Sequence, residues 1–91
     1  GINADIAFLG ASAVDVEKGV SSPSMEKAAL KQQILECARE KVLLSDSSKF
    51  GRVSFAKICG IDRFDRIITD AGLDPESEAQ LMETEIEWIK A

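Results

Sequence analysis

Short, continuous apolar runs are the feature that most limits how this chain can fold. Ile6-Ala7-Phe8-Leu9 and Val42-Leu43-Leu44 contain no polar residue, and Arg66-Ile67-Ile68-Thr69 is apolar at its centre. Runs of this length are typical of strands that are buried on both faces of a parallel sheet. Amphipathic stretches with helical spacing lie between such runs. This alternation predicts an α/β domain with a mostly parallel sheet flanked by helices.

Capping residues and apolar spacing set the expected order of the elements. One helix is expected to begin near Ser22 or Ser24, either of which can cap it, with Pro23 suited to a first helical position, and to end near Lys41. A second helix is expected to begin at Asp74-Pro75 and to run to about residue 85.

The remaining segments are read as strands and loops. We expect buried strands at residues 6–9, 42–45, 66–69 and 86–89. Residues 53–59 fit either a short strand or an irregular segment, and residues 13–24 read as a loop. The length of 91 residues fits one small domain, so residues 1–91 are expected to form a single unit.

Composition excludes several classes of function. The net charge of −5 argues against direct contact of this segment with nucleic acid, because DNA-binding domains carry a basic surface. No apolar run approaches the ~20 residues of a membrane helix, and no secretory signal is present. A cytoplasmic protein without membrane contact is therefore expected.

The chain contains no histidine, and this excludes histidine-based triads and most metal sites. Cys37 and Cys59 stand in apolar surroundings without metal-ligand spacing, so free buried thiols are expected, with a disulfide or metal role as the alternative. No metal, no cofactor and no standard catalytic constellation is expected. A carboxylate–lysine pair built from Asp15 and Lys49 is the one conceivable proton-transfer site.

Polar segments follow three of the expected strands. They are Gly10-Ala11-Ser12 with Asp15 beyond, Asp46-Ser47-Ser48-Lys49, and Asp70-Ala71-Gly72. In open α/β sheets ligands bind beyond the carboxyl ends of the strands, so these segments are expected to meet at one edge. A lysine with hydroxyls and free backbone N–H groups can hold a phosphate. The sequence therefore predicts a site for a small anion.

Each of these positions also has a purely structural reading. Gly10-Ala11-Ser12 can be only a tight turn, Lys49 a solvated loop lysine, and Asp70 a cap of its own turn. Lys31 falls inside the apolar arc of the first helix, where it either reaches water along its aliphatic stem or contacts a ligand.

Several motifs together resemble a known family. Asp46-Ser47-Ser48-Lys49-Phe50-Gly51, followed by Ile61-Asp62 and Ile67-Ile68-Thr69-Asp70, is similar to the C-terminal sensor domain of DeoR/GlpR-type transcriptional repressors. The upstream segments agree over nearly the whole chain. They are Phe8-Leu9-Gly10-Ala11-Ser12-Ala13-Val14-Asp15, Glu17-Lys18-Gly19-Val20 and Glu26-Lys27-Ala28-Ala29-Leu30-Lys31.

The resemblance implies a fold related to ribose-5-phosphate isomerase, glucosamine-6-phosphate deaminase and CoA transferases. It implies a repressor of a sugar-catabolism operon that binds a phosphorylated sugar effector and self-associates. DNA would be bound only through an N-terminal helix-turn-helix, which is not among these 91 residues. The first part of the sensor domain is not among them either. The residues that would bind the ligand are Gly10, Ala11, Ser12, Asp15, Gly19, Asp46, Ser47, Ser48, Lys49 and Phe50, with Lys31 and Asp70 as further positions.

The resemblance also argues against catalysis. The related isomerases carry an acidic D-G-A-D-E-type motif after the strand that here ends in Leu9-Gly10-Ala11, and Ser12 and Ala13 stand where carboxylates belong. Moving a proton between two sugar carbons requires a positioned base. A non-enzymatic sensor is therefore expected. Two alternatives remain open, namely a fragment of a sugar-phosphate isomerase or deaminase, and an oligomerisation module with a vestigial pocket.

Overall fold

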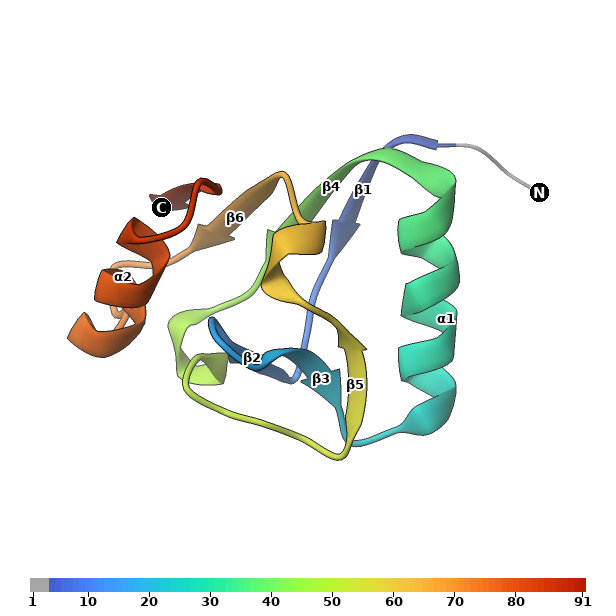
Figure 1. Cartoon of the computed structure of the whole chain (residues 1–91), viewed down its shortest axis with the longest axis horizontal. Coiled ribbons are helices and arrows are strands. Elements are labelled where there is room, and N and C mark those ends of the chain that lie inside the picture. Colours follow the sequence, from blue (N-terminus) through green and yellow to red (C-terminus); the bar gives the residue numbers. More distant parts are fainter. Residues whose placement is uncertain (1–3) are drawn as a thin grey trace.

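The computed structural model describes residues 4–91, which form two sheets and two α-helices (Figure 1). In the larger sheet the strands follow the order β1-β4-β6-β7, and every neighbouring pair is parallel. These strands are β1 (Ala4–Leu9), β4 (Ala38–Leu44), β6 (Arg66–Thr69) and β7 (Glu87–Lys90). The predicted α/β class with a mostly parallel sheet is therefore confirmed.

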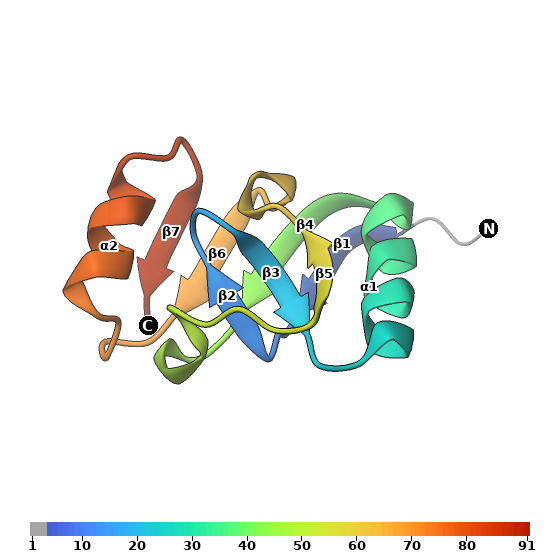
Figure 2. The ribbon, with the colours of Figure 1, turned by 60° about the horizontal axis from the view of Figure 1, so that its bottom comes forward.

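A smaller antiparallel sheet lies over one face of the parallel sheet (Figure 2). Its order is β2-β3-β5, with β2 (Ala13–Asp15), β3 (Gly19–Ser22) and β5 (Ala56–Cys59). The expected loop over residues 13–24 was wrong for most of its length. The Asp15 carboxylate accepts hydrogen bonds from the N–H groups of Glu17 and Lys18, at 3.0 and 2.8 Å, and this closes a tight turn between β2 and β3.

Both helices begin at the predicted caps. Ser24 accepts a hydrogen bond from the Lys27 N–H and begins α1 (Met25–Cys37), so Pro23 precedes the cap instead of occupying a first helical position. Asp74 caps α2 (Pro75–Met82), with Pro75 at its start. Two 3₁₀ turns complete the structure, η1 (Ser47–Lys49) and η2 (Ile61–Arg63).

The first helix was predicted too long. It ends at Cys37 because Ala38 is already extended and pairs with Ala4 of β1. Residues 38–41 favour helix by propensity, but strand pairing overrides this preference. Asp65 adds to the pairing, since its carboxylate accepts from the Lys41 N–H and its own N–H donates to the Lys41 carbonyl, both at 2.8 Å. The second helix is also shorter than expected, and the last strand is shifted by one residue, to 87–90.

One core lies between the two sheets and reaches both helices. Leu9, Leu43 and Ile67 stand in one row across the parallel strands and are at most 7% exposed. Val14, Val20 and Ile58 face them from the small sheet, while Leu35 of α1 and Leu81 of α2 close the ends. Cys59 belongs to this core, and Cys37 is half-buried. Both cysteines are free thiols.

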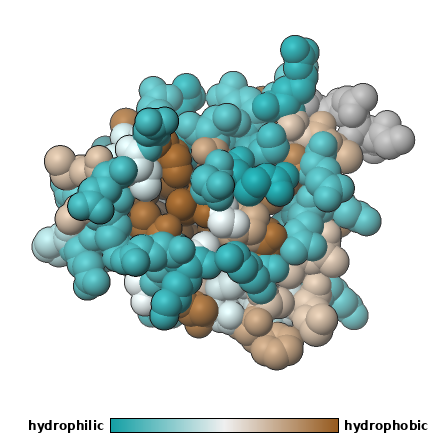
Figure 3. All heavy atoms as spheres, in the orientation of Figure 1, coloured by the Kyte–Doolittle hydropathy of each residue, from teal (hydrophilic) through white to brown (hydrophobic). Residues whose placement is uncertain are grey.

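The other face of the parallel sheet is open. Side chains alternate between the faces of a strand, so Phe8, Leu44 and Ile89 point away from the core, and they are 58%, 51% and 50% exposed. In α1, Leu30 and Ile34 are also exposed, so the apolar arc expected for that helix is buried only in part. On the face viewed in Figure 1, hydrophilic side chains surround a hydrophobic centre (Figure 3).

Gly19 permits the turn between β2 and β3, and its replacement tests that turn. Its φ is +104°, and an added Cβ would lie 2.5 Å from the Cys59 carbonyl oxygen, so Gly19→Ala combines backbone strain with a clash. We expect a loss of about 2 kcal/mol or more in the free energy of unfolding, measured by urea denaturation. Gly51→Ala is the matched control, since Gly51 has φ +75° but open space around it, and should cost about 1 kcal/mol. Equal losses in the two variants would contradict the clash.

Candidate functional site

The structure brings three strand ends together at one edge of the parallel sheet. The N–H of Ser45, directly after β4, donates to the Ile68 carbonyl at 3.1 Å. The Ser45 hydroxyl is 3.4 Å from the Ala11 carbonyl oxygen, in the turn after β1. The N–H of Ser47 donates at 2.9 Å to the carboxylate of Asp70, which follows β6. The three polar segments that the sequence singled out therefore form one continuous edge.

Asp46 shapes the turn that carries the expected phosphate-binding residues. Its Oδ1 accepts hydrogen bonds from both the N–H and the hydroxyl of Ser48, and its carbonyl accepts from the Lys49 N–H at 3.1 Å. The hydrogen bond from the Ser48 hydroxyl lowers the pKa of Asp46. Asp46 is therefore an ionised cap of η1, and both donors of Ser48 are already used inside the turn.

Asp70 connects two turns of the site. Its Oδ1 accepts from the Gly72 N–H and its Oδ2 from the Ser47 N–H, each at 2.9 Å. Hydrogen bonds from Ser47, followed by the one from Gly72, lower the pKa of the Asp70 carboxyl group. Asp70 caps its own turn, as the structural reading expected, and it also holds the β4 turn, which the sequence did not indicate.

Lys49 carries the free positive charge of the β4 turn. Its backbone N–H is used in the turn, but its ammonium makes no hydrogen bond and no ion pair with any residue from 4 to 91. The side chain is half-exposed at the edge of the sheet. A cation in this position is available to an anionic ligand.

Lys31 reaches the same edge from α1. Its Nζ donates to the Gly10 carbonyl oxygen at 2.6 Å, across 21 residues of sequence. Burial, together with the nearby charge of Lys27, lowers the pKa of Lys31. The side chain therefore holds the turn after β1, and the simple alternative of a lysine that only reaches water does not describe it.

Some predicted ligand residues have structural roles elsewhere. Phe50 is 7% exposed and packs in the core, while Gly19 lies in the β2–β3 turn. Asp15 uses Oδ1 to close that turn, which leaves Oδ2 for another donor. Ser12 is exposed beside Gly10 and Ala11 in the turn after β1. Ligand contacts of all these residues stay predictions.

A hollow lies beneath the site, at the ends of β4 and β6. Its volume is ≈ 240 Å³, and the apolar side chains of Leu44, Ile68 and Ala91 line it together with Ser45, Asp46, Thr69 and Asp70. The Thr69 hydroxyl is buried and has no hydrogen-bond partner within residues 4–91.

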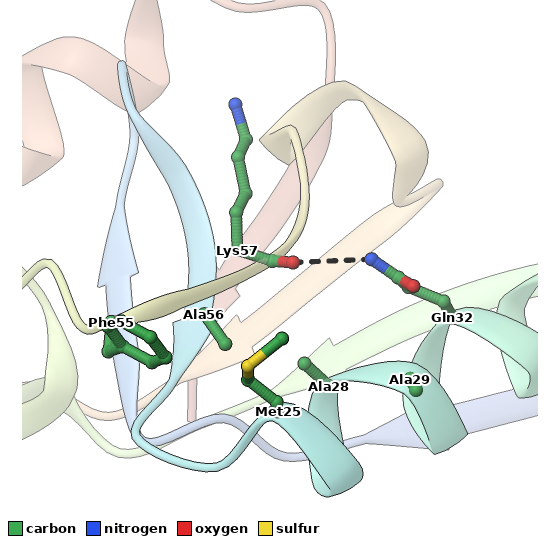
Figure 4. A pocket seen from close by; sticks show the side chains of 7 residues that line it. All are labelled: Met25, Ala28, Ala29, Gln32, Phe55, Ala56 and Lys57. Atoms are coloured by element: carbon green, nitrogen blue, oxygen red, sulfur yellow. Dashed lines mark hydrogen bonds between the residues drawn. The ribbon is translucent and has the colours of Figure 1, made fainter.

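Two other hollows do not have the features of an anion site. The groove between α1 and β5, ≈ 290 Å³, is lined by Met25, Phe55 and small side chains (Figure 4). Gln32 donates there to the carbonyls of Lys57 and Ile58, and the Lys57 ammonium points away. The hollow at the opposite end of the strands, ≈ 460 Å³, has Asp and Glu side chains in its lining and would repel a phosphate.

The part of the chain that the structure describes shows no metal centre. Across residues 4–91, no three cysteine, aspartate or glutamate side chains are placed to hold an ion. None of the helices in that range is long and apolar enough to span a membrane. The site is built from backbone and hydroxyl donors, the carboxylates of Asp46 and Asp70, and the lysines Lys31 and Lys49.

Comparison with known proteins gives a family and several relatives. A family model described as the DeoR C terminal sensor domain matches residues 1–71. The HTH-type transcriptional regulator GlpR of Haloferax volcanii is 39% identical over 79 residues, which cover 87% of this chain and 31% of the relative. The putative aga operon transcriptional repressor of Escherichia coli O157:H7 is 39% identical over 85 residues, with coverages of 93% and 32%.

A third relative is named as the repressor of an operon. The deoxyribose operon repressor of Escherichia coli K12 is 38% identical over 74 residues, which cover 81% of this chain and 29% of the repressor. The chain thus spans about a third of the length of the curated relatives it matches.

Asp70→Asn tests the brace between the turns. An amide cannot accept with both of its polar atoms, so one of the N–H groups of Ser47 and Gly72 loses its partner and the melting temperature should fall. The pKa of Asp70 is lower in the folded state than in the unfolded state, where it is about 3.9. The contribution of Asp70 to stability is therefore fully present above the unfolded pKa and is lost as pH falls through the folded pKa. The difference in melting temperature between wild type and variant should therefore shrink below about pH 4.

The matched control is Asp62→Asn, at an exposed carboxylate that accepts no hydrogen bond within residues 4–91. Its melting temperature should stay close to that of the wild type at neutral pH. An Asp70→Asn protein as stable as this control would contradict the brace.

Proposed function

We propose that this chain forms the C-terminal part of an effector-binding domain that senses a phosphorylated sugar. The premise is that the chain belongs to the family of DeoR C-terminal sensor domains. The whole protein would be a cytoplasmic transcriptional repressor of a sugar-catabolism operon. Relatives that are named as regulators of the aga and deoxyribose operons support this class. The observation that carries the proposal is the meeting of three polar strand ends, with the free Lys49 ammonium at their edge.

The proposed contacts follow from what each group has left to offer. Lys49 meets the phosphate, since its ammonium has no partner within residues 4–91. The turn at Gly10, Ala11 and Ser12 offers backbone N–H groups and space for the sugar. The carboxylates of Asp46 and Asp70 hold the β4 turn and can accept from sugar hydroxyls with their remaining lone pairs. Of the two serines, the Ser48 hydroxyl is engaged with Asp46, so its contact with phosphate requires exchange of that bond.

Charge also shapes the proposal. Asp46 and Asp70 carry two negative charges beside the single charge of Lys49, so these turns alone are not a strong phosphate cradle. Further donors are expected from polypeptide outside residues 1–91, where we also place the helix-turn-helix that binds DNA. The net charge of −5 supports a separate DNA-binding part.

A non-enzymatic role is part of the proposal. Ser12 and Ala13 occupy the positions where the related isomerases carry carboxylates, and the nearest carboxylate along the chain, Asp15, closes a turn. Within residues 4–91, the carboxylates of Asp15, Asp46 and Asp70 all accept hydrogen bonds inside turns, whereas proton transfer between sugar carbons requires a base positioned on the sugar. The relatives are named as transcriptional regulators, and this supports sensing over catalysis.

Lys49→Ala tests the proposed phosphate contact. Loss of a charge-assisted hydrogen bond should weaken binding of a sugar phosphate by about tenfold to a hundredfold. Titration calorimetry on the intact protein should use 2-deoxyribose 5-phosphate and fructose 1-phosphate, with unphosphorylated 2-deoxyribose as the negative ligand. Lys57→Ala is the matched control, because that exposed lysine lies by the α1–β5 groove. Unchanged affinity in Lys49→Ala would remove Lys49 from the site.

We propose that the effector signals by changing the self-association of the protein. The response of the oligomer to ligand distinguishes a sensor from an oligomerisation module with a vestigial pocket. A ligand can shift an oligomer only if its affinities for two arrangements differ. We expect the sedimentation coefficient of the intact protein to change when a bound sugar phosphate is added, and Lys49→Ala to need a higher concentration for the same change. An oligomer that stays unchanged at saturating ligand would favour the vestigial module.

A further inference from the structure

The turn after β1 is held by side chains from two other elements. Lys31 of α1 donates to the Gly10 carbonyl oxygen at 2.6 Å, and the Ser45 hydroxyl is 3.4 Å from the Ala11 carbonyl oxygen. These donors come from positions 21 and 34 residues further along the chain. A turn that needed only local geometry would not require such long-range partners.

The direction of each held carbonyl sets the direction of the next N–H group. In a trans peptide the C=O and the following N–H point to opposite sides, and no cis peptide is present among residues 4–91. With the Gly10 carbonyl turned to α1, the Ala11 N–H must point away from α1. The N–H groups of Ala11 and Ser12 donate no hydrogen bond to any residue from 4 to 91. The turn therefore presents donors that are oriented but not used.

The chemistry of the edge identifies the acceptor that these donors fit. The neighbouring β4 turn uses the N–H groups of Ser47 and Ser48 on its own carboxylates. Of the N–H groups from Ser45 to Ser48, only that of Asp46 donates no hydrogen bond within residues 4–91. The unused N–H groups of Ala11 and Ser12 are donors of the kind that an anionic oxygen accepts from, and the Lys49 ammonium of the β4 turn also has no partner within residues 4–91.

We infer that Lys31 is a positioning residue of the sugar-phosphate site, and that it acts by fixing the Gly10–Ala11 peptide so that the Ala11 N–H donates to an anionic oxygen of the effector. The inference rests on the proposed function and adds the residue that orients its donor. Lys31 itself does not contact the effector. Its effect on binding comes from the orientation of the Gly10–Ala11 peptide.

The variants separate this role from a general effect of charge. Lys31→Met removes the donor, Lys31→Arg keeps a cationic donor in its place, and Lys27→Met is the matched control. Lys27 lies one turn earlier on α1, is exposed, and makes no side-chain hydrogen bond or ion pair within residues 4–91. Melting temperatures establish that each variant is folded.

The measurement is binding of 2-deoxyribose 5-phosphate, fructose 1-phosphate and inorganic phosphate to the intact protein, with amide NMR at Ala11 as the second readout. Lys31→Met should bind the best of these probes about tenfold more weakly, with Lys27→Met unchanged and Lys31→Arg largely restored. Saturating probe should shift the Ala11 amide proton downfield in the wild type and in Lys27→Met, but much less in Lys31→Met. A role in folding alone would lower the melting temperature without removing this shift.

The outcomes distinguish this inference from the proposed function. Two results would overturn the role of Lys31 and leave the proposed sensor intact, provided that the wild type binds a probe. One is that Lys31→Met and Lys27→Met bind the probe with equal affinity. The other is that Lys31→Met keeps the shift of the Ala11 amide proton. A wild-type protein that binds none of the three probes would overturn both.

Discussion

The central place of β4 in the parallel sheet, between β1 and β6, is the constraint on which the rest of this structure depends. Val42 and Leu43 point to opposite faces of the sheet and both are 0% exposed. Their register with Phe8 and Leu9 on one side, and with β6 on the other, fixes where β4 stops. Because all neighbours are parallel, the residues after β1, β4 and β6 emerge at one edge. A slip of one residue would bring the neighbouring side chains to the wrong faces and separate the turns that form the site.

Within that edge, the carboxylates and Lys31 hold backbone groups, while the Lys49 ammonium has no partner within residues 4–91. Asp46 and Asp70 are kept ionised by hydrogen bonds from Ser48 and Ser47, so their charges are used to order turns. The Asp15 carboxylate closes the β2–β3 turn by accepting from the N–H groups of Glu17 and Lys18. A carboxylate that accepts several N–H bonds is a poor general base, because its proton affinity is already low. The same contacts that build the edge therefore weaken the capacity of Asp46 and Asp70 to take up a proton.

The sequence predicted the parts of the fold that local chemistry decides. Asp74 with Pro75 marked the start of α2, Ser24 capped α1, and Arg66–Thr69 had the bounds of β6. The end of α1 was missed because pairing with β1 converts residues 38–41 to strand. The β2–β3 hairpin was missed although a turn residue, Asp15, and the glycine at position 19 stand between short runs with valines.

The site shows the same division between local and distant contacts. The sequence predicted that the strand ends meet, because parallel strands end at the same edge of a sheet. It also predicted an available charge at Lys49, because this lysine lies in a polar turn. The second bond of Asp70 and the reach of Lys31 to Gly10 join residues 23 and 21 positions apart, and a sequence pattern does not contain such contacts. Under the proposed function these two contacts matter most, since one joins the β4 turn to β6 and the other joins the β1 turn to α1. A ligand that binds both turns would connect the sheet to a helix whose Leu30 and Ile34 are exposed. The binding energy could then favour one position of that helix surface over another, which is what a change of partner contacts requires.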